Sequence, residues 1–190
     1  MQIAKITFVV DENRIVCLRR ATQEDDRFLV EVYGSTREDE LALTDWSASQ
    51  RAAFVEMQFR AQQSHYREYY PEGELYVILA GDTAIGRLYV AEIEKEVRIL
   101  DITVLPKHRG AGVGRRVIEA LLSEGTAIGK PVRIYVESFN RSLGLFQRLG
   151  FSKIDENEHS YLMEWRAEEG TGRAGDGGTG RRGGGETGRR

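Results

Sequence analysis

Residues 104–116 read Val-Leu-Pro-Lys-His-Arg-Gly-Ala-Gly-Val-Gly-Arg-Arg, and the rest of the chain is best interpreted from this stretch. An apolar, β-branched run from Ile99 stops at Pro106, and an amphipathic segment with apolar residues at helical spacing starts at Val113. The glycines between them permit a tight turn and leave backbone N–H groups uncovered. The pattern predicts a strand, a glycine-rich turn and the start of a helix, in that order.

The glycine-rich turn has the chemistry of an anion site. N–H groups at a helix start point outward, and the helix dipole favours negative charge there. Arg109, Arg115 and Arg116 add positive charge. No Lys-Ser/Thr pair follows the glycines, which excludes a Walker A loop, and their spacing fits a dinucleotide fingerprint poorly. We therefore expect a loop that binds a pyrophosphate.

Two motifs together resemble a known family. Read as Arg-x-x-Gly-x-Gly, residues 109–114 resemble the coenzyme A pyrophosphate loop of the GCN5-related N-acetyltransferases (GNAT). Residues 140–151 resemble the second signature of that family, with Ser142 where Ala is usual and Phe146 where Tyr is usual. The two signatures cover residues 97–165, which makes the pair much more specific than either one alone.

The second signature also predicts a helix from its residues alone. Asn140 is a good N-cap, and apolar residues follow it at helical spacing. Gly150 is placed to end the helix in a left-handed conformation.

The resemblance implies an α/β (α+β) fold in which a mixed, mostly antiparallel sheet of six to seven strands is flanked by about four helices. The sheet is expected to splay open between its fourth and fifth strands. Helices are expected from Thr22, from Ser47 to Tyr69, after the glycine-rich turn and from Asn140, with a loop over residues 35–45. Strands are expected at 16–19, 75–79, 85–90, 97–105, 132–137, 151–155 and 160–165, with residues 6–10 as an extra one.

Composition sets the class of protein. The 190 residues are 41% hydrophobic and 30% charged, which suits one globular domain. No long apolar run or signal peptide is visible, so we expect a cytoplasmic protein without a membrane partner. The single cysteine, Cys17, excludes an internal disulfide, and three scattered histidines give no metal site.

The end of the chain differs from the rest in its amino-acid composition. The last 21 residues hold ten glycines and five arginines but no large apolar residue. Such a segment buries too little surface to offset its ordering entropy. We expect residues 1–167 to form the acetyltransferase domain and residues 168–190 to form a disordered Gly/Arg-rich tail. Such tails can contact nucleic acid, but the simpler interpretation is a dispensable extension.

The resemblance implies acetyl-CoA as the acyl donor, lying in the gap between the splayed strands. Backbone N–H groups of the strand before the loop would bind its pantetheine arm and polarise the thioester carbonyl. The residues expected to bind acetyl-CoA are Ile102, Thr103, Val104, Arg109, Gly110, Ala111, Gly112, Val113, Gly114, Arg115, Asn140 and Phe146.

Direct transfer to an amine requires a group that removes a proton from it. Asp101 is the first candidate, because several family members keep an acid at this position. The alternative for Asp101 is a structural strand acid, paired for example with Arg98. Glu137, at the end of the next strand, is the second candidate.

The departing thiol raises a separate question. The tyrosine common at position 146 can protonate the sulfur, and phenylalanine has no hydroxyl. Tyr135, Tyr161 or water could take this role.

The acceptor pocket of this fold is usually lined by the first helix, the loop after it and the long second helix. The residues expected to bind the acceptor are therefore Tyr33, Arg37, Glu40 and Trp46. An acidic body suits a cationic amine, whereas Arg37 suits an acceptor that carries a carboxylate.

The function expected is that of an acetyl-CoA-dependent N-acetyltransferase, acting on the amine of a small molecule, an amino acid or a peptide N-terminus. The alternative is a catalytically silent acyl-CoA-binding or regulatory domain, which Phe146 favours. The resemblance also allows a homodimer.

Overall fold

The computed structural model describes residues 6–11 and 14–167, so the predicted tail lies outside the described residues. Within them, one eight-stranded sheet has the order β1-β2-β3-β4-β5-β6-β8-β7, one strand more than the expected maximum because the extra N-terminal strand also joins. The strands are β1 (Thr7–Asp11), β2 (Arg14–Arg20), β3 (Gly73–Ala80), β4 (Thr83–Ile93), β5 (Glu96–Val104), β6 (Val132–Glu137), β7 (Ser152–Glu156) and β8 (Ser160–Trp165).

Five α-helices occur in the described residues, against about four expected. They are α1 (Asp26–Gly34), α2 (Glu38–Ala42), α3 (Ala48–Tyr69), α4 (Val113–Ala127) and α5 (Leu143–Arg148), with 3-10 turns η2 (Gln23–Asp25) and η3 (Pro106–His108). The additional helix, α2, lies in the predicted loop, where five residues are too few to show a helical period. None of the described helices is long and apolar enough to cross a membrane.

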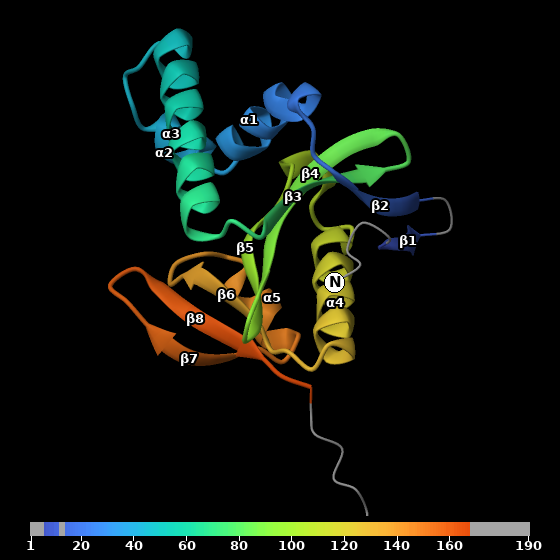
Figure 1. Ribbon diagram of the computed structural model, residues 1–190. Coiled ribbons are helices and arrows are strands. Elements are labelled where there is room, and N and C mark those ends of the chain that lie inside the picture. The colour runs from blue at the N-terminus through green and yellow to red at the C-terminus, as the bar shows by residue number, and fades with distance from the viewer. Residues whose placement is uncertain (1–5, 12–13, 168–190) are drawn as a thin grey trace, which may run out of the picture.

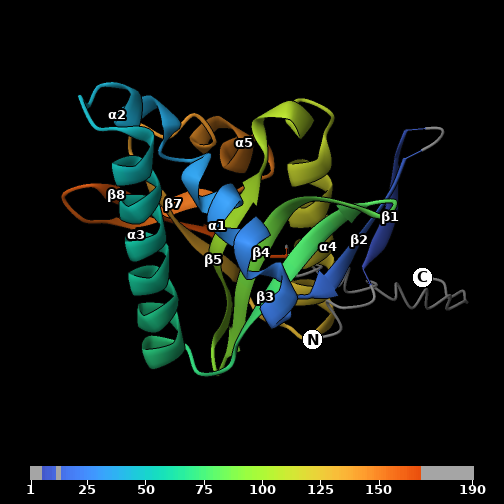
Figure 2. The same ribbon diagram turned by 90° about the horizontal axis from the view of Figure 1, so that it is seen from above.

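The helices cover both faces of the sheet (Figures 1 and 2). Helix α4 buries its apolar side, including Val117, Ile118 and Leu121, against one face. Helices α1 and α3 lie over the other face, where a smaller core joins Leu29 and Phe59 to β3. The amphipathic spacing of each helix thus decides which face of the sheet it covers.

Helix starts follow the cap residues in the sequence. Ser47 begins α3 as predicted, because its Oγ accepts from the Gln50 N–H at 3.3 Å while Gln50 Oε1 accepts from the Ser47 N–H at 2.8 Å. Thr22 opens η2, which leads directly into α1.

The predicted left-handed end of α5 is confirmed at Gly150, with φ of 88° and a 3.0 Å hydrogen bond from the Phe151 N–H to the Phe146 carbonyl. The prediction of Asn140 as N-cap is wrong. The helix begins at Leu143, and Asn140 Oδ1 instead accepts from the Ser142 N–H at 2.9 Å. Asn140 closes the turn that precedes the helix.

The predicted splay lies between β5 and β6, the fourth and fifth strands when β1 is left out of the count. These strands pair in parallel only from Val97–Ile99 to Val132–Ile134. The next residue, Leu100, has no partner in β4, where the register shifts between Tyr89 and Val90. This bulge bends β5 at the point where its pairing with β6 ends.

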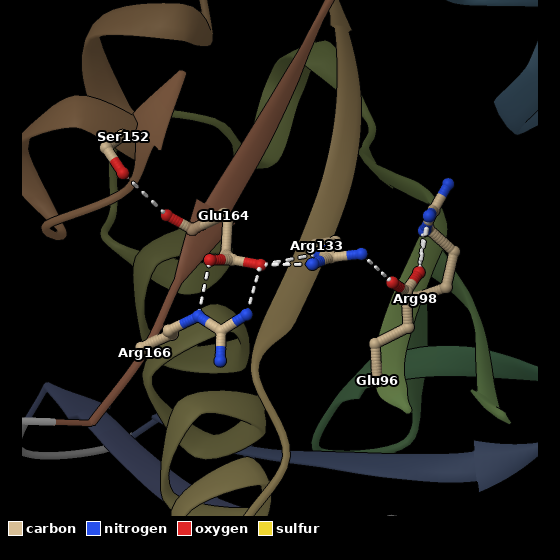
Figure 3. A network of polar contacts seen from close by, with 6 residues as sticks. All are labelled: Glu96, Arg98, Arg133, Ser152, Glu164 and Arg166. Atoms are coloured by element: carbon tan, nitrogen blue, oxygen red, sulfur yellow. Dashed lines mark hydrogen bonds and ion pairs between the residues drawn. The ribbon is translucent and has the colours of Figure 1, made fainter. Parts of the chain in front are cut away.

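A network of charged side chains joins the strands below the splay (Figure 3). Arg133 on β6 donates to Glu96 on β5 at 2.5 Å and to Glu164 on β8 at 2.6 Å. Arg98 and Arg166 complete the ion pairs of the two acids. The network ties β5, β6 and β8 together at the closed end of the gap, so that only the other end opens.

Candidate active site at the splayed strands

The glycine-rich turn presents bare backbone amides. Gly110 and Gly112 have φ of 81° and 78°, a left-handed conformation that favours glycine. Gly112 is the N-cap of α4, whose first hydrogen bond runs from the Arg116 N–H to the Gly112 carbonyl at 3.0 Å. The amides of residues 113–115 therefore lack an intrahelical partner. A Cβ added at Gly110, Gly112 or Gly114 would meet no atom within 4 Å, so the space beside the turn is open.

The arginines near the turn are partly engaged. Arg109 Nε donates to the Val104 carbonyl at 2.7 Å, which fixes the turn to the end of β5. Arg115 pairs with Glu119 at 2.8 Å, and Arg116 approaches the same carboxylate at 3.7 Å. The arginines keep a net positive charge at the turn, which adds to the attraction of its amides and the helix dipole for an anion.

The open edge of β5 offers further donors. The Leu105 N–H donates to the Ile85 carbonyl on β4 at 2.9 Å. The N–H groups of successive residues in a strand point alternately to its two edges. Since the N–H of Leu105 points to β4, the N–H groups of Ile102 and Val104 point away from it. They face the side on which β6 has separated, so the gap is lined by amides that no strand pairs.

These two sets of amides fit the chemistry of coenzyme A. The exposed amides around Gly112 suit a pyrophosphate, and the free strand edge suits the amide groups of a pantetheine arm. Val113 is 2% exposed and packs its side chain in the core, so only its backbone can contribute. Ala111 lies half-buried in the same turn.

Asp101 is held by several donors on the face covered by α1 and α3. Arg87 on β4 donates to its two carboxylate oxygens at 3.1 and 2.7 Å, and Thr103 Oγ1 donates at 3.0 Å. Arg87 also donates to Gln62 on α3 at 2.9 Å. The predicted pairing of Asp101 with Arg98 is therefore wrong: β5 turns at the bulge, and Arg98 binds Glu96 instead.

Helix α3 is also tied to the bulge itself. The Tyr66 hydroxyl donates to the Leu100 carbonyl at 3.0 Å. Burial, with the nearby Asp101 carboxylate, raises the pKa of Tyr66 well above its usual value. Tyr66 therefore keeps its proton and serves as a donor to the bulge.

On β6, the predicted residues Tyr135 and Glu137 share one face. Ile134 and Val136 pack in the core on the α4 side, so by alternation Tyr135 and Glu137 point to the α1/α3 side, like Asp101. Tyr135 is half exposed and lies 5.1 Å beneath the guanidinium of Arg98. The Glu137 carboxylate forms no hydrogen bond or ion pair with the described residues.

Phe146 lies inside the core. It is 2% exposed and packs edge-on against Phe151, with ring centroids 5.3 Å apart. Its position explains why an apolar ring is tolerated there, and it carries no group that can move a proton.

The predicted acceptor residues separate into two groups. Tyr33 is 4% exposed, with the guanidinium of Arg37 5.6 Å from its ring, and Arg37 pairs with Glu40 at 3.1 Å. Trp46 lies apart from these contacts and packs edge-on against Phe54.

Sequence reasoning missed Arg87 and Gln62. Arg87 left a signal, because it interrupts the apolar strand run Ile85 to Val90. A charge in such a run indicates a buried partner, though not which one. Gln62 left no signal beyond its place on a helix.

A model of the acetyltransferase (GNAT) family matches residues 39–151. Solved structures also resemble the chain in fold. A PaiA N-acetyltransferase from Thermoplasma acidophilum, in complex with coenzyme A, is 16% identical, with a TM-score of 0.62 over 80% of this chain and 99% of its own. An acetyltransferase from Thermus thermophilus is 17% identical, with a TM-score of 0.60 over 80% and 97%.

A ribosomal-protein-S5-alanine acetyltransferase from Vibrio fischeri is 16% identical, with a TM-score of 0.57 over 87% of this chain and 98% of its own. A search of the curated proteins found no match.

Proposed function

Since this chain belongs to the acetyltransferase (GNAT) family, with acetyl-CoA as its co-substrate, we propose that it transfers the acetyl group directly to the amine of a small molecule, an amino acid or a peptide N-terminus. The observation that carries the proposal is the gap itself, where β5 leaves β6 at Leu100 and exposes the amides of Ile102 and Val104. Acetyl-CoA supplies an activated acetyl group as a thioester when it is bound.

The chain's own groups divide the work of binding. The amides around Gly110 and Gly112 bind the pyrophosphate, and the free N–H groups of β5 hold the pantetheine arm and polarise the acetyl carbonyl. Holding the two reactants in register supplies several kcal/mol of the rate enhancement, about 7–11 at best. The acceptor approaches from the α1/α3 side, where the Arg37–Glu40 pair can bind the charged groups of an amino acid or peptide terminus.

Two carboxylates, those of Asp101 and Glu137, face that side, and they differ in the number of hydrogen bonds that they accept. Both carboxylate oxygens of Asp101 already accept hydrogen bonds, from Arg87 and Thr103. Glu137 has no such donors within the described residues. We therefore assign direct proton removal from the amine to Glu137, and Asp101 acts through water or by fixing Arg87.

One observation favours a second candidate, a silent acyl-CoA-binding domain. Phe146 is buried and has no hydroxyl, so it cannot supply a proton to a thiol. Among the described residues Tyr135 on β6 is half exposed, and the enzyme hypothesis assigns the proton to its hydroxyl or to water.

Release of free thiol from acetyl-CoA, measured with a panel of amines, amino acids and peptides, distinguishes the two. We expect turnover with at least one acceptor, and a fall of about 10²–10⁴-fold in kcat/KM for Glu137→Gln. Gly112→Val should raise the KM for acetyl-CoA sharply, because valine disfavours φ of 78° and covers the amides. Binding of acetyl-CoA without turnover on any acceptor supports the silent domain, and full activity of Glu137→Gln contradicts the assignment of the base.

A further inference from the structure

A second hollow lies on the α1/α3 side of the sheet. It is a cleft of about 640 Å³ between the start of α1 and the C-terminal half of α3, with the beginning of β3 and Tyr89 of β4 beneath it. Small-molecule sites commonly have volumes of about 300–1,000 Å³. The size of the cleft therefore suits a small organic ligand.

Helix α3 separates this cleft from the gap. Gln62 and Tyr66 point from α3 towards β4 and β5, where they bond to residues beside Asp101. Arg60, Ser64 and Arg67, spaced four and three residues apart, line the cleft from another side of the same helix. The cleft therefore opens on a different side of α3 from the gap.

The cleft has a surplus of hydrogen-bond donors. Arg67 forms no ion pair with a carboxylate of the described residues. Burial raises the pKa of Tyr89, and the positive charge of Arg67 opposes this shift. Of the acids that line the cleft, Glu74 is already bound by Arg20 and by the Tyr76 hydroxyl. The remaining acid, Asp26, is exposed at the start of α1, as Arg67 is near the end of α3.

Gln63 adds a buried amide at the same place. Its side chain lines the cleft and is 8% exposed, and its Nε2 donates to no atom of the described residues. A buried amide nitrogen without an acceptor costs free energy, and such groups in native proteins usually have a partner. A ligand oxygen would supply that partner after a rotation of the amide that exchanges its two ends.

The cleft also has an apolar part, beside the polar Thr22, Gln23 and Ser64. Leu29, Phe59 and Leu75 contribute side chains to the cleft, next to the ring of Tyr89. A ligand with both an anionic end and an apolar end would satisfy both parts of the lining. A fully polar anion such as phosphate would leave the apolar part in water.

We propose that this cleft is a second binding site, independent of the coenzyme gap, for a small organic acid. Its carboxylate accepts from Arg67 and Gln63, and its apolar part packs on Phe59 and Leu75. Because Gln62 and Tyr66 lie on the same helix, a ligand here would also stiffen the wall of the proposed acceptor site.

Calorimetric titration of the full chain tests the site without any measurement of activity. The probes are 3-phenylpropionate, hexanoate and 4-methylpentanoate, each compared with its neutral amide and its primary amine. We expect saturable binding of at least one acid, with its amide and amine bound much more weakly. Arg67→Gln should weaken binding about 10-fold or more, because a charge-assisted hydrogen bond is lost.

Two controls separate this site from others. Arg27→Gln removes an exposed arginine of α1 that does not line the cleft and should leave binding unchanged. Gly112→Val, aimed at the coenzyme loop, should also leave it unchanged. The proposal is overturned if no acid binds, if amines bind as well as acids, if Arg67→Gln binds normally, or if acetyl-CoA displaces the acid competitively.

Discussion

The side chain of Arg87 is the most deeply buried charge in the described part of the chain. It is 1% exposed, and its guanidinium lies 5.5 Å from the ring of Tyr33 and 5.6 Å from that of Phe59. Its hydrogen bonds to Asp101 and Gln62 join β4, β5 and α3. A single residue thus links the elements that surround the proposed acceptor site.

Replacing Arg87 by methionine should destabilise the fold strongly. The variant keeps most of the volume but leaves the Asp101 carboxylate without its charged partner, which typically costs about 3–5 kcal/mol. Urea unfolding measures the loss. Arg27→Gln, an exposed arginine on α1, is the control and should change the free energy of unfolding by less than about 0.5 kcal/mol. A loss below about 1 kcal/mol for Arg87→Met would show that the pair is not effectively buried.

At the scale of elements, the contact between β4 and β5 decides where the free amides lie. Gly86 on β4 is close to the backbone of β5, so a Cβ there would be 2.3 Å from the Thr103 carbonyl oxygen and 3.0 Å from the Val104 Cα. Both of these atoms belong to the backbone, so a change of side-chain rotamer could not relieve the contact. The glycine therefore lets β5 run close beside β4 in the segment that carries the amides of the gap.

Gly86→Ala should push the two strands apart. We expect a loss of about 1–3 kcal/mol of stability, as for overpacking in a core, together with a raised KM for acetyl-CoA. Urea unfolding and steady-state kinetics measure the two effects. Gly114→Ala is the matched stability control, because its Cβ meets nothing within 4 Å and alanine favours helix. Equal stability of the two variants would contradict the close approach at Gly86.

The ion pair at the junction of β2 and α1 makes the stability of the fold depend on pH. Hydrogen bonds from Arg19 and then from Thr22 lower the pKa of Asp25 from 3.8 to about 2. A lowered folded-state pKa stabilises the protein above about pH 4, and the stabilisation is lost as the pH falls towards 2. Because Arg19 is half exposed, we expect only about 1 kcal/mol. Asp25→Asn should be less stable than the wild-type chain by this amount at pH 6, and the difference should disappear as the pH falls through about 2.

Most elements were predictable because each carries its own signal. The cap at Ser47, the glycine-rich turn and the apolar runs of β3–β6 act locally, and the structure has them where the sequence placed them. The bulge at Leu100 and the partner of Asp101 were not predictable, since both depend on the register between β4 and β5. The site therefore follows from the sequence on the coenzyme side and requires the structure on the acceptor side.

At the scale of the whole molecule, the strand order at one edge of the sheet is β6-β8-β7, so the sheet needs its last strand, β8, to hold this edge together. Strand β8 lies between β6 and β7, so it is paired on both sides although it comes last in the described chain. Its Met163 is 2% exposed in the core. We therefore propose that the domain extends at least to the end of β8, and that it covers residues 1–167.

Truncation of the chain tests this boundary. Removing residues 168–190 deletes ten glycines and five arginines but no large apolar side chain, so little buried surface can be lost. We expect Tm to stay within about 1 °C of the full chain, since each kcal/mol shifts a domain of this size by about 2–4 °C. Truncation after Asn157, which removes β8, should abolish cooperative unfolding. A loss of several degrees on removing only 168–190 would show that this segment packs on the domain, because nothing in its composition could otherwise contribute that free energy.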